Sequence, residues 1–142
     1  MIDRINGFLK GQNNCVLATV RQGRPHCSLM SYVADPEVAF IYLVTHRNTS
    51  KYRNLLDNPN VSLLIDNRKQ RVDKHNTCAL TVHGTFQSLP TDVQQSSVRP
   101  LFLERHADMH RFIEHPETEF ISIRIASFLF LDGIVDAHYI EL

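Results

Sequence analysis

The sequence predicts a mainly β fold, a barrel with peripheral helices, and three of its features lead to this class. Short apolar runs of strand length recur along the chain and are joined by brief polar turns, which favours antiparallel hairpins over parallel crossovers. In the last quarter of the chain, Phe120, Ser122 and Arg124 alternate with Ile121, Ile123 and Ile125, as the two faces of a half-buried strand do. Helical spacing of apolar residues is confined to a few segments. Together these features predict six or seven antiparallel strands with two or three helices.

The first part of the chain predicts one helix and three strands. Residues 2–11 place their apolar side chains at helical spacing, on one face. The run CVLATV at residues 15–20 predicts the first strand, and a polar turn over 21–25 follows it. The runs HCSLMSYV and VAFIYLV predict the next two strands, at residues 26–33 and 38–44.

The remainder of the chain alternates between helices and strands. The expected elements are a helix at about 49–57, a strand at 61–66, an exposed loop at 67–76, a strand at 78–89 and a helix from 90 to about 106. Gly84 marks a bulge or bend in the fifth strand. The final segment, from about residue 120, is expected to run as strand, to break at the Asp132-Gly133 pair and to finish as strand.

Composition limits the classes of function. The 142 residues fit one domain over 1–142, with 43% hydrophobic and 21% charged residues. Fifteen basic residues balance fifteen acidic ones, so there is no electrostatic signal for nucleic acid or for a membrane surface. No apolar run has the length of a membrane span or the pattern of a signal peptide. Three cysteines without CxxC spacing indicate reduced thiols, and we expect a cytoplasmic location.

The segment Asn48-Thr49-Ser50-Lys51 opens a short helix directly after an apolar strand. A helix N-terminus leaves backbone N–H groups unpaired and carries about half a positive charge. Two hydroxyl groups and the lysine ammonium add donors of the kind that a phosphate group needs. The alternative interpretation is an ordinary N-cap at Asn48 or Thr49 with a solvated lysine, and residue types alone leave both open.

The order of these motifs resembles the FMN-binding split-barrel family related to pyridoxamine 5′-phosphate oxidase. The resemblance consists of an LATV strand, a Gly-x-Pro turn, a strand that ends in Thr45, a short helix with a Ser-x-Lys-like opening, and an NP pair before a VSLL strand. It covers about residues 13–66 well and 78–88 weakly. It implies a six- to seven-stranded antiparallel split barrel that binds FMN and forms a homodimer with the flavin at the subunit interface.

The resemblance also implies the cofactor-binding residues. Thr49, Ser50 and Lys51 match the positions that hold the FMN phosphate. The strand residues that match positions near the ring and the ribityl chain are Ser28, Leu29, Met30, Ser31, Val44 and Thr45. Backbone groups on a strand can pair with the polar edge of the flavin ring, and Leu29 or Met30 can cover an apolar face.

Two departures separate this chain from pyridoxamine 5′-phosphate oxidase itself. Ser28 stands where that enzyme has an arginine, and Val33 stands where it has a lysine. Arg47 or Arg53 can replace the lost positive charge. The C-terminal segment also lacks the aromatic and arginine residues that serve the substrate there. We therefore expect an oxidoreductase that transfers hydride or electrons through FMN to an unidentified small molecule, not to pyridoxamine 5′-phosphate.

No side chain stands out as a catalytic acid or base, and three alternatives remain open. A flavin carrier or redox sensor would bind the cofactor without turnover, and a deazaflavin could replace FMN. A haem-binding protein would need a histidine ligand, for which His138 is the candidate.

Histidine clusters suggest a metal site only weakly. His106 and His110 stand four residues apart, so on a helix both would face one side, with His115 following. A second group comprises His75, Cys78 and His83, but strand geometry places Cys78 and His83 on opposite faces. His26 and Cys27 are adjacent in a strand and cannot pair as base and nucleophile. We therefore expect no metal.

Overall fold

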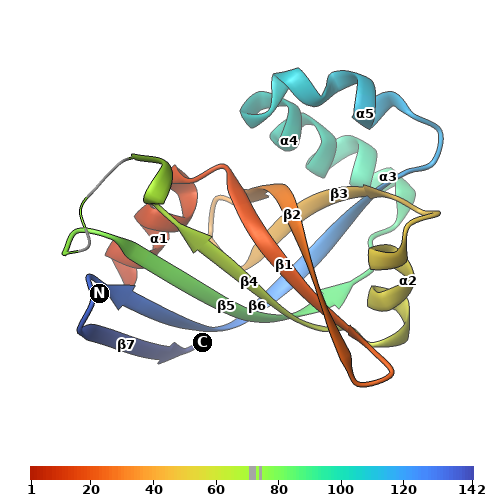
Figure 1. Cartoon of the computed structure of the whole chain (residues 1–142). Coiled ribbons are helices and arrows are strands. Elements are labelled where there is room, and N and C mark those ends of the chain that lie inside the picture. The colour runs from red at the N-terminus through yellow and green to blue at the C-terminus, as the bar shows by residue number, and fades with distance from the viewer. Residues whose placement is uncertain (71–72, 74) are drawn as a thin grey trace.

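The protein forms a closed antiparallel barrel of six strands, to which a seventh strand is added (Figure 1). The computed structural model describes residues 1–70, 73 and 75–142. Its strands are β1 (Asn14–Arg21), β2 (Arg24–Ala34), β3 (Phe40–His46), β4 (Asn60–Asp66), β5 (Cys78–Gln87), β6 (Thr118–Asp132) and β7 (Asp136–Glu141). The order across the sheet is β3-β2-β1-β4-β5-β6-β7, and pairing of β3 with β6 closes the barrel. The predicted fold class is confirmed.

Helices occupy the ends and one side of the barrel. They are α1 (Ile2–Gly11), α2 (Ser50–Asp57), α3 (Thr91–Val93), α4 (Arg99–Arg105) and α5 (His110–Glu114). A π-helical turn, Gln94–Val98, joins α3 to α4, so the predicted helix over 90–106 exists with a local irregularity. Short 3₁₀ turns lie at Arg68–Gln70 and Ala107–Met109. None of the helices within the described residues has the length and apolar character needed to cross a bilayer.

The apolar side chains form two cores of different size. The main core fills the barrel, where Leu17 and Leu63 are fully buried, and α1 and α2 each contribute a leucine to it (Leu9 and Leu55). Figure 1 places these two helices at opposite ends of the barrel. A smaller core lies between the helical segment α3–α5 and the outer faces of β3 and β6; its buried members are Val44, Val98, Phe102, Ile113 and Phe120.

Two local details differ from the sequence-based prediction. The turn of the first hairpin contains only Gln22 and Gly23, both at positive φ, and Pro25 lies inside β2. Proline is tolerated there because this stretch of β2 pairs with β1 alone, at an edge. The strand expected from residue 38 begins at Phe40, because Val38 has a φ of 56° in a turn. The Asp35 carboxylate fixes that turn by accepting the N–H groups of Ala39 and Phe40, each at 2.7 Å.

Other boundaries agree with the prediction. The bulge expected at Gly84 is present, as a register shift against β6 between His83 and Gly84. A Cβ atom at Gly84 would lie 2.5 Å from the Arg124 carbonyl oxygen, so the strands approach too closely there for a side chain. The loop expected at 67–76 contains a 3₁₀ turn, and its residues 71, 72 and 74 lie outside the described part.

Candidate functional site

The barrel opens where β2 and β3 separate, and this opening is the candidate site. The two strands pair only between residues 32–34 and 41–43. Residues 28–31 of β2 pair with β1 alone, and residues 44–46 of β3 pair with β6 alone. Within the described residues, the facing edges of these two stretches therefore carry backbone N–H and C=O groups that no strand takes up. Such groups can pair with the polar edge of a planar ligand.

The side chains along this opening point in different directions. Met30 is buried in the main core, whereas Leu29 is 78% exposed on the outer face of the sheet. Of the two residues proposed to cover an apolar ligand face, only Leu29 has a free side chain. Val44 is buried in the smaller core, so only its backbone can face a ligand. Ser28 and Ser31 are half-buried at the same opening.

Thr49 caps helix α2, and this function occupies its hydroxyl group completely. The hydroxyl accepts the Tyr52 N–H at 3.4 Å and donates to the His46 carbonyl oxygen at 2.9 Å. It also lies 3.1 Å from the hydroxyl of Thr45, which can donate to it. A hydroxyl has one proton and two lone pairs, so all three positions are used. The N-cap interpretation thus describes the Thr49 hydroxyl, and its neighbours provide further donors for an anion.

Those neighbours provide a cluster of donors at the first turn of α2. The amides of Ser50 and Lys51 are the first two of the helix and have no acceptor within it. Ser50 is exposed, and its hydroxyl lies 3.4 Å from the Arg53 guanidinium. The half-buried Lys51 adds a positive charge to the same turn. We call Ser50, Lys51 and Arg53, with the two amides, the anion cradle.

Arg47 lies outside the anion cradle, although it is close in sequence. Its guanidinium donates to the carbonyl oxygens of Pro116 at 2.8 Å and Thr118 at 3.1 Å. It also pairs with the carboxylates of Glu117 and Glu119, at 3.6 and 3.5 Å. Two arginines were considered as replacements for the missing positive charge. Arg53 belongs to the anion cradle, whereas the Arg47 guanidinium already pairs with the segment that follows α5.

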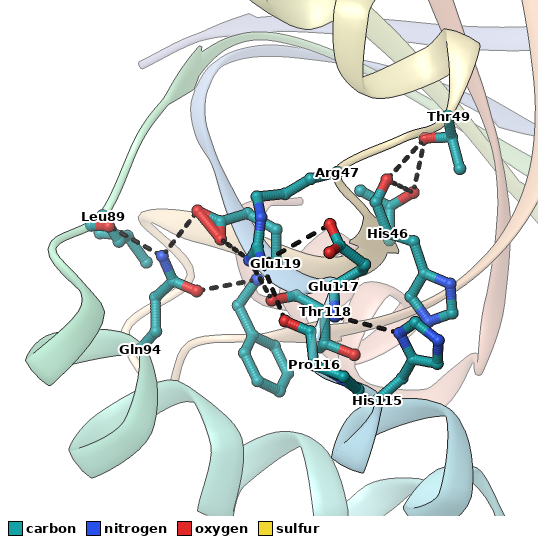
Figure 2. A network of polar contacts seen from close by, with 12 residues as sticks. His46, Arg47, Thr49, Leu89, Gln94, His115, Pro116, Glu117, Thr118 and Glu119 are labelled. Atoms are coloured by element: carbon teal, nitrogen blue, oxygen red, sulfur yellow. Dashed lines mark hydrogen bonds and ion pairs between the residues drawn. The ribbon is translucent and has the colours of Figure 1, made fainter.

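A polar network connects the loop between β3 and α2 to the helical segment α3–α5 (Figure 2). Gln94, in the π-helical turn, is 3% exposed and donates to the Leu89 carbonyl at 2.8 Å and to Glu119 at 3.1 Å. Its carbonyl oxygen accepts the Phe120 N–H at 3.0 Å. Arg47 and Gln94 therefore bind the two oxygens of one carboxylate. Nothing in the sequence near either residue signals this network, because its members lie far apart along the chain.

The histidines that would share one face of a continuous helix lie apart in the structure. His106 follows α4 and is buried, with Nε2 at 2.7 Å from the Tyr32 carbonyl oxygen. His110 begins α5 and pairs with Glu114 at 3.1 Å. His115 instead stacks on His46, with ring centroids 4.4 Å apart. In the described part of the chain, no group of three or more His, Cys, Asp or Glu residues could hold a metal ion.

The other residues considered for chemistry lie away from the opening. The buried Cys78 thiol lies 3.6 Å from Asp132, to which Arg4 also donates. Burial, together with the hydrogen bond to Asp132, raises the pKa of this thiol, so it stays protonated. His83 lies on the outer face of the sheet, and His138, the haem-ligand candidate, is half-buried on β7 opposite Phe130.

Comparison with known proteins identifies the family. The family model described as pyridoxamine 5′-phosphate oxidase matches residues 1–132, so the chain belongs to this family. Among functionally curated proteins, none matches the sequence.

Three solved structures illustrate the range of similar folds. General Stress Protein 26 from Bacillus anthracis aligns with a TM-score of 0.76 at 22% identity, over 99% of this chain and 97% of that one. An FAD-binding protein from Mesorhizobium loti aligns with a TM-score of 0.74 at 17% identity, over 92% of this chain and 93% of that one. A haem-binding protein from Mycobacterium smegmatis aligns with a TM-score of 0.82 at 18% identity, over 94% of this chain but only 55% of that one. At these identities the similarity establishes the fold alone.

Proposed function

We propose that the protein binds FMN in the opening between β2 and β3 and acts as an oxidoreductase on a small molecule. The observation that carries this proposal is the combination of two strand edges that no neighbouring strand covers with the anion cradle at the start of α2. The strand edges match the polar edge of a flavin ring, and the cradle matches its phosphate in charge and in number of donors. Membership of a family named for a pyridoxamine 5′-phosphate oxidase supports a flavin at this place.

The residues present fit such a cofactor. Ser50, Lys51 and Arg53 would hold the phosphate, with two helix amides, and the backbone of residues 28–31 would hold the ring edge. Leu29 is free to cover an apolar face of the ring. Bound flavin supplies hydride and one-electron chemistry, while the protein orients it and excludes water. With Ser28 in place of an arginine, Arg53 provides the second cation.

A homodimer would complete this site. Five apolar or aromatic side chains on the outer face of the sheet are exposed: Leu29, Leu64, Leu129, Leu131 and Tyr139. Exposed apolar residues on one sheet face are typical of a surface that another protein covers. Because Leu29 belongs to both this surface and the opening, we propose that a second copy of the chain packs here and helps to enclose the flavin. Light scattering of wild type and of Leu64→Asp tests this, and a monomeric wild type would contradict it.

The visible absorption spectrum of the purified protein tests the cofactor assignment. Oxidised-flavin bands are expected, and mass spectrometry of the heat-released compound distinguishes FMN from FAD or a deazaflavin. Lys51→Ala should lower FMN affinity about 10- to 150-fold, the range for one charge-assisted hydrogen bond. Lys10→Ala is the matched control, because Lys10 is exposed and donates to the Pro36 carbonyl oxygen. A colourless protein that also takes up no added FMN would exclude this function. Reduction of the bound flavin by a nicotinamide, followed by turnover, separates an enzyme from a carrier.

A further inference from the structure

The loop between β3 and α2 is anchored to the segment that follows α5. The Arg47 backbone N–H donates to the Glu117 carbonyl oxygen at 2.9 Å, and its guanidinium donates to two more carbonyl oxygens of that segment, those of Pro116 and Thr118. Three hydrogen bonds from one residue therefore connect segments that are distant in sequence. A planar guanidinium can donate to two carbonyls at once in a fixed geometry, which a lysine cannot do.

The residue before it strengthens the same connection. The His46 ring lies between two other rings, with centroid distances of 4.1 Å to Phe112 and 4.4 Å to His115. The His46 carbonyl oxygen accepts the Thr49 hydroxyl, which caps α2. The contacts of residues 46 and 47 thus fix the peptide that leads directly into the first turn of α2 (Figure 2).

The charges around Arg47 also reach that turn. Burial is the largest cause that raises the pKa of Tyr52. The carboxylate of Glu119 raises this pKa further, and the Arg47 guanidinium lowers it. Tyr52 lies in the first turn of α2, so both charges act where the anion cradle lies. Without the guanidinium, the carboxylates of Glu117 and Glu119 would lose their ion pair with Arg47 and would repel a phosphate group there.

We propose that Arg47 is a positioning residue for the anion cradle, which it serves without touching the ligand. It holds the loop in the conformation that presents the amides of Ser50 and Lys51, and it neutralises the acidic side chains behind them. This proposal rests on the proposed flavin site. If Arg47 acts in this way, a change in the segment around Glu117 should alter the affinity for the phosphate of the cofactor without any direct contact between the two.

The test compares two ligands that differ only in the phosphate, FMN and riboflavin. Arg47→Ala should weaken FMN binding about tenfold and leave riboflavin binding within about twofold, because the ring contacts remain. Arg47→Lys should recover part of the lost FMN affinity, because lysine restores the positive charge but cannot donate to two carbonyl oxygens in the fixed geometry of a guanidinium. Arg99→Ala is the matched control, because Arg99 lies in the same helical segment and its polar partners are Glu114 at 3.7 Å and Gln95 at 3.1 Å.

Hydrogen exchange in the absence of flavin provides a second readout. The backbone amide of residue 47, which donates to the Glu117 carbonyl oxygen, should exchange faster in Arg47→Ala than in wild type or in Arg99→Ala. If wild type binds FMN and Arg47→Ala weakens both ligands equally, or neither, the positioning proposal is wrong while the flavin site stands. If wild type binds neither ligand, the flavin site is wrong and the proposed role of Arg47 fails with it. Unchanged exchange of the residue 47 amide would also overturn the proposal.

Discussion

Replacement of Thr49 by alanine tests how the start of α2 is built. The structure assigns the Thr49 hydroxyl to three hydrogen bonds within the loop, with the Tyr52 N–H, the His46 carbonyl and the Thr45 hydroxyl. Its only proton points to the His46 carbonyl, so none remains for a phosphate. We therefore expect Thr49→Ala to reduce the stability of the protein and to change FMN affinity only slightly.

The magnitude follows from the contacts that are lost. Removal of a threonine N-cap costs about 1 kcal/mol, with a range of roughly 0.5–2 kcal/mol. The half-buried position of Thr49 and the loss of the donor to His46 place the expected decrease in unfolding free energy at about 1–2 kcal/mol. Thr49→Ser keeps the hydroxyl and should stay within about 0.5 kcal/mol of wild type.

Urea denaturation followed by circular dichroism measures the stability of the three proteins, and fluorescence quenching measures their FMN affinity. Thr49→Ala should bind FMN within about threefold of wild type, because the Arg47 hydrogen bonds still hold the loop, whereas Lys51→Ala should lose about tenfold or more. The opposite pattern, in which Thr49→Ala keeps full stability and loses FMN as severely as Lys51→Ala, would show that the hydroxyl binds the ligand and does not cap the helix.

Four further predictions concern the barrel. Gly84→Ala should lower the unfolding free energy by about 1–3 kcal/mol, because the new Cβ would lie 2.5 Å from the Arg124 carbonyl oxygen; a thermal melt at wild-type temperature would contradict this. Gln22→Asn should raise stability by a few tenths of a kcal/mol, up to about 1 kcal/mol, because asparagine tolerates the positive φ of this turn better than glutamine, and urea denaturation checks the sign. In native protein a thiol reagent should label only the exposed Cys27. Burial raises the pKa of Cys15 to about 12. In the unfolded chain this thiol ionises near the ordinary value of about 8.5, so the free energy of unfolding should decrease as pH rises above that value. Cys15→Val removes the thiol and should reduce this decrease.

Much of the barrel was predictable because its signals are local. Alternation of apolar and polar residues predicted the strands, and the polar opening of α2 predicted the helix start. The mutual pairing of β3 and β6 had no such signal, because it joins residues 40–46 to residues 118–124. The helix end near residue 106 was predicted, and His106 does leave helical geometry there, with a φ of −128°. The short helix α5 that begins at His110 was not predicted.

The candidate site was predictable in part, for the same reason. The cluster Thr49-Ser50-Lys51 is continuous in sequence, so its place at a helix start could be inferred. The roles of its members could not, since Thr49 is occupied by Thr45 and His46 through the fold of the loop. Arg47 was considered as a phosphate ligand because its partners at residues 116–119 are distant in sequence, so no local pattern indicates that it binds them.

The late closure of the barrel has a consequence for folding during synthesis. The outer edge of β3 acquires its partner only when β6, near the end of the chain, has been made. Until then, the apolar residues Leu43 and Val44 lie on a strand with one edge largely open, a state that favours pairing with other chains. The long sequence separation also predicts a slow final step, because a large loop must close before the new pairing contributes any stability. Truncation before β6 should therefore yield an aggregating product rather than a smaller barrel.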